Sequence, residues 1–458
     1  MRVSRKRTAR TAAVAVAATL AVVAAGCGGS SSSNNSAKSG SSGGVAGAQT
    51  TQVHKGVSGS VTFFGVWTGE EQKAFGKVIS AFNKQYPNVK VNYKPEGNNL
   101  NTVLATAITG GNPPDVADIA QPGYVKQLAQ QGHLKPITYA KSVIAKNFAP
   151  AWQQLGSVNG KLYALVYKAA NKSLLWYNVP AFKQAGVNAP KTWSQLVNVQ
   201  STLKASGTPA WSLCGASGWT LTDLFENIYL RTYGPAKYDA LSAHKVKWTD
   251  SSVTKALNEM AQIVGDSSNL AGGTSGALQT DYPTCVTSAF SSPPKGAMVP
   301  EADFVGGQIL TATKAKPGTG FNAVSFPSIN KKYASGVEIG GDLLVTFRDN
   351  PAVEAFMKYL ATPQAALIWA KIGGFGTGNK NVPASAYPDA ITRATEAPIG
   401  EAKSVVFDMS DEQPASFGST TGQGEWGIFQ KFLQNPKNVK GIQQQLEKAA
   451  AAAYKKGK

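Results

Sequence analysis

The chain has 458 residues, of which 42% are hydrophobic and 16% charged, and Lys and Arg outnumber Asp and Glu by 45 to 26, for a formal net charge of +19. This composition is typical of a globular protein and excludes a disordered or fibrous one. At about three times a modal domain of roughly 150 residues, the chain is expected to form two or more lobes. Its three Cys and three His exclude a dense metal cluster and a small disulfide scaffold.

Residues 1–26 have the pattern of an export signal, since basic residues precede an apolar run over 12–25 that ends in small residues before Cys27. A short anchor that stays in the membrane is the alternative, but it would need about 20 apolar residues. The segment resembles a bacterial lipoprotein signal, which implies that Cys27 is lipidated as the first residue of the mature chain. We therefore expect a lipid-anchored protein on the outer face of the cytoplasmic membrane.

Residues 27–56 predict a flexible tether. They are almost all Ser, Gly, Asn, Ala and Thr, which cannot bury enough apolar surface to offset the entropy of ordering. A Gly/Ser-rich chain of this length has a root-mean-square span of roughly 30 Å. Such a tether would hold a folded body just off a membrane.

Beyond the tether, β-rich runs alternate with helical patterns. Strands are predicted at 60–64, 89–93 and 115–119, with apolar helical stripes between them. This alternation favours an α/β fold with a mostly parallel sheet. Ligands of such sheets bind beyond the carboxyl ends of the strands, which points to the loops 66–69 and 120–123.

Four helix starts carry capping signals. Two have the spacing of a capping box, Thr68 with Glu71 and Thr192 with Gln195. The other two place an N-cap residue before a proline, at Asn350 and Thr362.

Motifs of nucleotide binding and nucleophilic catalysis are absent from the sequence. There is no G-x-x-x-x-G-K-[ST] loop and no G-x-S-x-G elbow, and the three His lack metal-ligand spacing. The positive charge is spread out without a long basic run. We therefore expect no cofactor, no metal and no nucleic-acid partner.

The remaining cysteines form an even pair. With Cys27 lipidated, Cys214 and Cys285 are left in an oxidising compartment, where a disulfide between them is expected. Two buried free thiols are the alternative, since free Cys is often a small core residue.

Aromatic residues beside polar ones are the best indication of a ligand. Trp67 adjoins a threonine, Trp219 lies near Asp223, and Glu301 is close to Phe304. Sugars present apolar C–H faces and rings of hydroxyls, so a sugar site combines flat aromatic platforms with carboxylates or amides. Any one Trp is still more often a core residue than a platform.

Two close carboxylate pairs, Glu301 with Asp303 and Asp408 with Asp411, keep a glycoside hydrolase open, because acid/base cleavage needs two carboxyl groups across a sugar. Separation along the sequence does not give their separation in space.

Several segments share the order and spacing of one family; they are 111–115 (GNPPD), 121–123, 159–163 (NGKLY), 175–178 (LWYN), 185–186, 190–193 (PKTW) and 340–342. Together they resemble the extracellular solute-binding proteins, family 1, of carbohydrate ABC transporters. A narrower resemblance, to the α-glucoside-binding branch, is carried by 217–219, 222–223, 231, 234–235, 238, 248–250, 347–351, 359–363, 373–375 and 407–411. A Cys pair placed like Cys214 and Cys285 also occurs in that branch.

The resemblance implies a two-lobed periplasmic-binding-protein-like α/β fold, with mixed or parallel sheets flanked by helices and a multi-strand hinge. Lobe 1 is expected to comprise 57–166 and 321–372, and lobe 2 to comprise 167–320 and 373–458. The hinge crossings are expected near 165–168, 320–326 and 371–374.

Carried over by position, the resemblance implies ligand contacts from Trp67, Thr68, Gln121, Trp219, Asp223, Glu301, Asp342 and Phe417. Within this set we expect Trp219 to be a stacking platform and Glu301 a hydrogen-bond acceptor.

The sequence therefore predicts a monomeric, non-enzymatic binding lipoprotein that captures an α-glucoside-type mono- or oligosaccharide between two lobes and delivers it to an ABC permease. A secreted glycoside hydrolase and a cell-wall glycan-binding module are the alternatives.

Overall fold

A computed structural model of the chain describes residues 52–396, 399 and 405–456. The expected export signal, Cys27 and the tether as far as residue 51 lie outside these residues. In the part of the chain that is described, no helix combines the length and the apolarity needed to cross a membrane.

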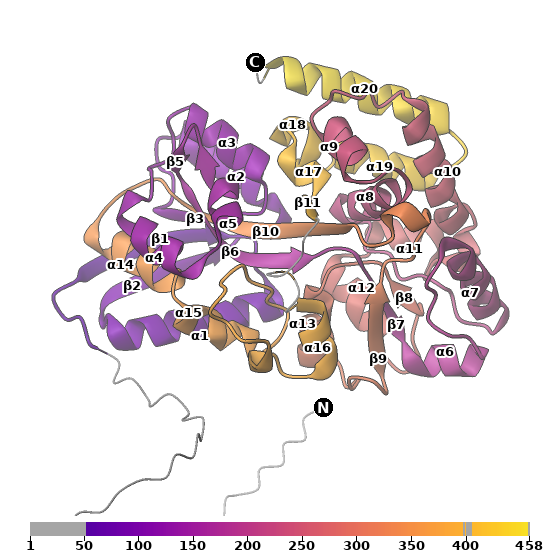
Figure 1. Ribbon diagram of the computed structural model, residues 1–458, viewed down its shortest axis with the longest axis horizontal. Coiled ribbons are helices and arrows are strands. Elements are labelled where there is room, and N and C mark those ends of the chain that lie inside the picture. The colour runs from indigo at the N-terminus through magenta and orange to yellow at the C-terminus, as the bar shows by residue number, and fades with distance from the viewer. Residues whose placement is uncertain (1–51, 397–398, 400–404, 457–458) are drawn as a thin grey trace, which may run out of the picture. The chain divides into compact units, whose positions relative to one another are not determined.

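The larger sheet has six strands. They are β2 (Asn88–Pro95), β1 (Ser58–Gly65), β3 (Val116–Ile119), β10 (Val337–Thr346), β11 (Val405–Phe407) and β6 (Ala164–Asn171). β1 pairs in parallel with β2 and β3, as predicted, whereas β10 runs antiparallel to β3 and to β6. Figure 1 shows β6 and β10 side by side across the centre, where they connect the two lobes.

Helices cover both faces of this sheet. They include α1 (Gly69–Gln85), α2 (Leu100–Thr109), α3 (Pro122–Gln130), α4 (Lys141–Asn147), α5 (Pro150–Leu155), α14 (Pro351–Leu360) and α15 (Pro363–Ala370). Phe63 of β1 packs with residues of α1, α14 and α15, while the neighbouring Phe64 faces the core formed with α2 and α3. Alternation of side chains along a strand explains why adjacent residues belong to different cores.

The second lobe is built around a three-stranded sheet in the order β8 (Met298–Val299), β7 (Leu174–Asn178), β9 (Phe321–Ser325). Its helices are α6 (Val179–Ala185), α7 (Trp193–Ala205), α8 (Trp219–Tyr233), α9 (Pro235–Ser242), α10 (Ser251–Val264), α11 (Gly273–Gln279), α12 (Tyr282–Ala289), α13 (Phe304–Ala312), α16 (Ala390–Glu396), α17 (Met409–Glu412), α18 (Ala415–Gly418), α19 (Gly424–Gln434) and α20 (Val439–Lys456). Most of α8 is buried beneath α10 and α19, which makes α8 the centre of this lobe's core.

Residues 321–325, which the sequence analysis assigned to lobe 1, form β9 and pair with β7 of the smaller sheet. Phe321 is fully buried there, 6.0 Å from the ring of Trp176. The chain returns to the larger sheet at β10, so the expected crossing at 320–326 is corrected to the position of β10.

Three of the four predicted helix caps are confirmed. Thr192 and Gln195 form the capping box, and Asn350 and Thr362 accept hydrogen bonds from backbone N–H groups of the first turn. The capping box at Thr68 is wrong, because Thr68 stands at the N-cap without a side-chain cap bond. Its expected partner, Glu71, instead pairs with a lysine of β6.

Candidate ligand-binding site

A cavity of about 610 Å³ lies between the two lobes, beside β6 and β10. From the lobe of the larger sheet it is lined by Val66, Trp67, Thr68, Gly69, Glu70, Glu71, Glu96, Gly97, Asn98, Asn99, Leu100, Asn101, Ala120, Gln121, Gly341 and Asp342. The crossing strand and the other lobe supply Lys168, Ala169, Ala170, Lys172, Ser217, Trp219, Asp281, Tyr282, Pro283, Phe304, Gln308, Ala312, Asp408, Asp411, Thr421 and Trp426. The strand-end loops expected at 66–69 and 120–123 therefore do border a cavity.

One wall is aromatic. Trp219, Tyr282 and Phe304 begin α8, α12 and α13, and their ring centroids lie 5.3 to 6.2 Å apart. All three are partly exposed, and Trp426 of α19 adds a buried indole beside them. Trp426 can pack this close to the start of α8 because residue 218 is a glycine. The φ of Gly218 is +94°, and a Cβ there would lie 2.7 Å from the Cβ of Trp426.

The opposite wall carries a carboxylate and an ammonium. Asp342 of β10 accepts a hydrogen bond of 2.7 Å from the indole N–H of Trp67. The β6–β10 register shifts between Asp342 and Leu343, a bulge of the kind that redirects side chains next to sites. Lys168 of β6 pairs with Glu71 and lies 3.9 Å from Asp342. Burial would lower the pKa of Lys168, but Glu71 and Asp342 raise it above its ordinary value, so the ammonium stays charged.

Trp67 is a core residue whose indole N–H group contacts the polar wall of the cavity. It is only 1% exposed, and its ring packs 4.7 Å from Phe75 and 5.0 Å from Trp369. Its N–H group points at Asp342, so Trp67 holds that carboxylate in place.

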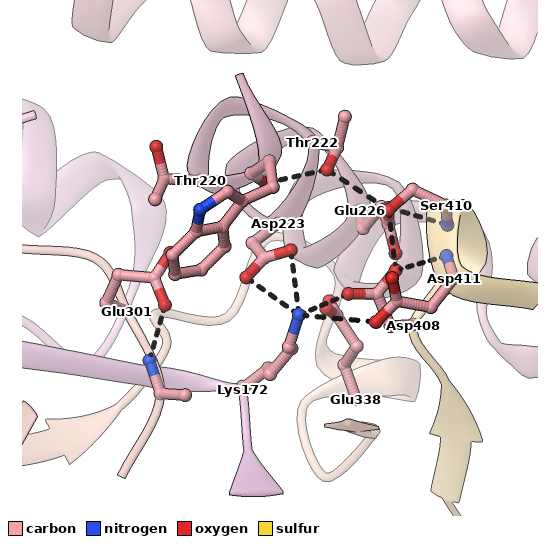
Figure 2. Close-up of polar contacts among 12 residues, drawn as sticks. Lys172, Thr220, Thr222, Asp223, Glu226, Glu301, Glu338, Asp408, Ser410 and Asp411 are labelled. Atoms are coloured by element: carbon pink, nitrogen blue, oxygen red, sulfur yellow. Dashed lines mark hydrogen bonds and ion pairs between the residues drawn. The ribbon is translucent and has the colours of Figure 1, made fainter. Parts of the chain in front are cut away.

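Lys172, just after β6, lies at the centre of a buried polar network (Figure 2). Its Nζ lies 3.2 Å from Oδ1 and 3.1 Å from Oδ2 of Asp223, pairs with Asp408, and lies 4.0 Å from Asp411. Burial would lower the pKa of Lys172, but these carboxylates raise it well above the ordinary value. The ammonium also lies over the Trp219 ring, 5.5 Å from its centroid, and so ties the aromatic wall to the network.

The carboxylates of Asp223, Glu226 and Asp408 lie within 4.8 Å of one another, a spacing that would suit a metal. Their oxygens already have partners, however. Lys172 occupies the space between Asp223 and Asp408, and Glu226 accepts from the hydroxyl of Tyr238 at 2.6 Å. The donor set thus fits an ammonium rather than a metal.

Of the eight predicted contact residues, Trp67, Thr68, Gln121, Trp219 and Asp342 line the cavity. Asp223, Glu301 and Phe417 lie behind the wall, each 2% exposed or less. Phe417 packs edge-on against Trp248 in the core of the second lobe. This placement corrects the expectation of direct contact for these three.

Glu301 is held in this position by the backbone N–H of the next residue. Its Oε2 accepts from the N–H of Ala302 at 3.0 Å, and burial, opposed by Lys172, raises the pKa of the carboxyl group to about 7. Neither Glu301 with Asp303 nor Asp408 with Asp411 forms a pair that faces across the cavity, because Glu301 and Asp303 are buried beside it and Asp408 is engaged by Lys172.

Hydrogen bonds join the two lobes along one edge of the cavity. The Nε2 of Gln121 donates to Asp411 at 3.0 Å, and the Nδ2 of Asn101 donates to the carbonyl of Ser419 at 3.1 Å. Asn98 donates to the hydroxyl of Ser217 at 2.7 Å. The two lobes are therefore in contact along this edge, and the side-chain amides of Gln121, Asn101 and Asn98 bridge them.

Cys214 and Cys285 are bonded to each other, and both are buried. Cys214 precedes α8, and Cys285 lies in α12, the helices that present Trp219 and Tyr282. The bond thus fastens two parts of the aromatic wall together.

Sequence reasoning missed most of the wall around these residues. Tyr282, Trp426, Asn98, Asn101 and Lys168 were not predicted, and Phe304 was noticed only as a neighbour of Glu301. A usable signal was present for two of them, because Tyr282 and Phe304 are the first residues of helices and each directly follows an aspartate at the N-cap position.

Residues 67–367 match the model of the family described as bacterial extracellular solute-binding protein. The chain is 29% identical over 368 residues to the osmoprotective compounds-binding protein GgtB of Synechocystis sp., which covers 79% of this chain and 86% of that protein. It is 30% identical over 372 residues to the α-glucosides-binding periplasmic protein AglE of Rhizobium meliloti, over 79% of this chain and 81% of that protein.

A solved structure has the same two-lobed fold. It is that of the bacterial solute receptor AcbH, described as having an exclusive preference for β-D-galactopyranose. The two superpose with a TM-score of 0.75 at 20% identity, over 86% of this chain and 98% of the other. Because the family match spans well over half of the sequence, the chain belongs to the bacterial extracellular solute-binding proteins, which act outside the cytoplasm and bind solutes rather than transform them.

Proposed function

We propose that the protein is the substrate-binding component of a carbohydrate ABC importer and captures an α-glucoside-type mono- or oligosaccharide. The observation that carries this proposal is the pairing of an aromatic wall with a polar wall across one cavity. Trp219, Tyr282 and Phe304 offer flat faces for sugar C–H groups, and Asp342 and Asn101 opposite them offer hydrogen-bonding groups.

The size of the cavity supports a ligand larger than one sugar ring. About 610 Å³ lies in the usual range for ligand pockets and equals the volume of about 20 water molecules at about 30 Å³ each. A disaccharide has about two dozen non-hydrogen atoms. A disaccharide therefore matches the cavity better than a single hexose does.

The α-glucoside assignment is supported by the sequence likeness to AglE and by the motifs quoted above for that branch. Binding would draw the lobes together by stabilising the closed state, in proportion to the ligand's differential affinity for it. The permease would then recognise the closed protein. We propose that the protein acts as a monomer, held at the membrane by a lipid on Cys27.

Thermal unfolding of the exported protein tests the substrate class. A ligand at a hundred times its Kd should stabilise the protein by about 2.7 kcal/mol. We expect a rise in Tm with at least one of maltose, trehalose, sucrose and longer α-glucans, and none with cellobiose, the β-linked counterpart of maltose. Stabilisation by cellobiose alone would overturn the α-linkage, and no response to any neutral saccharide would overturn the function.

The anchor is tested separately. Cys27→Ser should move the protein from the membrane fraction to the soluble or unprocessed fraction, whereas Cys214→Ser, the matched control, should leave the fractionation unchanged. A Cys27→Ser protein as firmly membrane-bound as the parent would refute the lipid anchor.

A further inference from the structure

The cavity has the opposite charge to the chain around it. The chain carries a formal net charge of +19, yet the described residues that line the cavity include seven carboxyl groups and two ammonium groups. Burial and Asp408 raise the pKa of one carboxyl group, that of Asp411, well above its ordinary value, so acidic groups outnumber ammonium groups by six to two without it. The carboxyl groups are those of Glu70, Glu71, Glu96, Asp281, Asp342, Asp408 and Asp411, and the ammonium groups are those of Lys168 and Lys172. A low-dielectric cleft lined with one sign of charge focuses that field on its ligand.

Both ammonium groups are already engaged. Lys168 is paired with Glu71 and lies above the ring of Phe304, 4.7 Å from its centroid. Lys172 is shared by Asp223 and Asp408. Their side chains are only 5% and 9% exposed. An incoming phosphate or carboxylate would have to displace a protein carboxylate to reach either one.

Two of the helices that begin at the cavity, α1 and α12, carry acidic side chains at their N-termini. The start of a helix is an anion site only while its N–H groups and partial positive charge are free. α1 begins with Glu70 and Glu71 in its first turn, and the side chain of Asp281 caps α12 by accepting from the N–H of Thr284 at 2.9 Å. At α12 a protein carboxylate thus occupies the position that an anionic ligand would use, and at α1 two carboxylates add negative charge beside the helix start.

From this arrangement we infer that the cavity selects its ligand by charge. It takes saccharides that are neutral or that carry an ammonium group in place of a hydroxyl, and it rejects phosphorylated or carboxylated ones. The inference rests on the proposed function for its saccharide ligand and adds the charge class, with Glu71 as a specificity-determining residue. Glu71 has this role because it keeps Lys168 from binding an anion.

Calorimetric titration with matched probes tests the inference. The probes are trehalose, 6-amino-6-deoxytrehalose and trehalose 6-phosphate, together with glucose, glucosamine and glucose 6-phosphate. For whichever neutral parent binds, the phosphate should bind at least about tenfold more weakly, and the amine should bind at least as tightly as the parent. Raising the salt concentration should narrow the gap between parent and phosphate.

A variant pair shows whether Glu71 sets the selectivity. Glu71→Gln removes the partner of Lys168 and should narrow the gap between phosphate and parent by at least about threefold, because the freed ammonium can then meet the phosphate. Glu354→Gln is the matched control, since Glu354 forms a similar pair with Lys358 at 3.2 Å on the surface of α14, and it should leave the gap unchanged.

The outcomes separate this inference from the function on which it rests. Equal binding of phosphate and parent overturns the charge selection and leaves the function standing. If the amine and the phosphate both bind more weakly than the parent by the same factor, the charge selection is overturned too, since the cavity would then exclude both ligands by size. No binding by any neutral parent overturns the proposed function itself. The probe series uses the unaltered protein, so it remains decisive even if Glu71→Gln does not fold.

Discussion

Replacing Lys172 by Met keeps most of the side chain but removes the ammonium that Asp223 and Asp408 share. The lysine side chain is 9% exposed, and the two aspartates are 2% and 1% exposed. Asp223 lies on the buried helix α8, so water can reach the two carboxyl groups only from the side of the cavity. The substitution therefore leaves two buried carboxyl groups without their main partner.

Breaking a buried pair by removing one partner costs about 3 to 5 kcal/mol. Against a typical total stability of about 5 to 15 kcal/mol, this is about a fifth or more of the free energy of unfolding. Lys204→Met provides the matched control, because Lys204 pairs with Asp266 at 2.7 Å but their side chains are 41% and 51% exposed. An exposed pair is worth about 1 kcal/mol or less.

Urea unfolding at several pH values is the assay. Burial would raise the pKa of Asp408, and Lys172 holds it below the ordinary value; without Lys172 the pKa of Asp408 should rise above that of the unfolded chain. The folded variant then binds more protons than its unfolded chain, so its free energy of unfolding should fall as pH rises. The difference in free energy of unfolding between the parent and Lys172→Met should therefore be smallest in acid. A Lys172→Met deficit no larger than that of Lys204→Met, or one independent of pH, would refute the reasoning.

Three further predictions concern stability and binding. Burial raises the pKa of Asp303 to about 7, above its unfolded value of about 4, so the free energy of unfolding should decline by up to about 4 kcal/mol as pH rises from 4 to 7. Asp303→Asn keeps an oxygen that can accept from the N–H of Asn171, and in urea titrations it should flatten that decline. Cys214→Ser opens a cross-link between cysteines 71 residues apart and should cost about 4 kcal/mol, measured against the protein under reducing conditions, where the difference should vanish. Trp219→Ala should weaken sugar binding at least about tenfold in calorimetry with little change in Tm, because the ring is partly exposed; unchanged binding would make Trp219 a structural residue.

Local patterns predicted the first lobe well. The strands β1, β2 and β3 and the loops that follow β1 and β3 could be inferred from alternating strands and helices, because each element there is close in sequence to its partner. The position of Trp67 could be inferred from its loop, but its burial could not. Its indole is covered by Phe75 and by Trp369, and the latter lies 302 residues away in the sequence.

Asp223, one of the residues behind the cavity wall, shows a second limit of prediction from the sequence. Asp223 lies four residues after Trp219 on α8, and side chains at this spacing share a helix face one turn apart. Trp219 begins α8 at the cavity, so Asp223 lies one turn deeper, where it meets Lys172 instead of a ligand. A sequence motif indicated the right helix but could not tell how far along the helix the cavity extends.

The pairing of β6 with β10 also predicts where the lobes rotate. Lys168 of β6 and Lys172, the first residue after β6, both line the cavity, but Lys168 pairs with Glu71 of the first lobe and Lys172 with Asp223 of the second. The backbone between them must absorb any relative motion. Ala169 and Ala170 there pair with Gly341 and Gly340 of β10, so both strands carry small residues at one level. We expect ligand-dependent hydrogen exchange at residues 169–171 and 340–341, and little change at β1. An unchanged exchange rate at these residues, with changes elsewhere in β6 or β10, would place the rotation outside the two lysines.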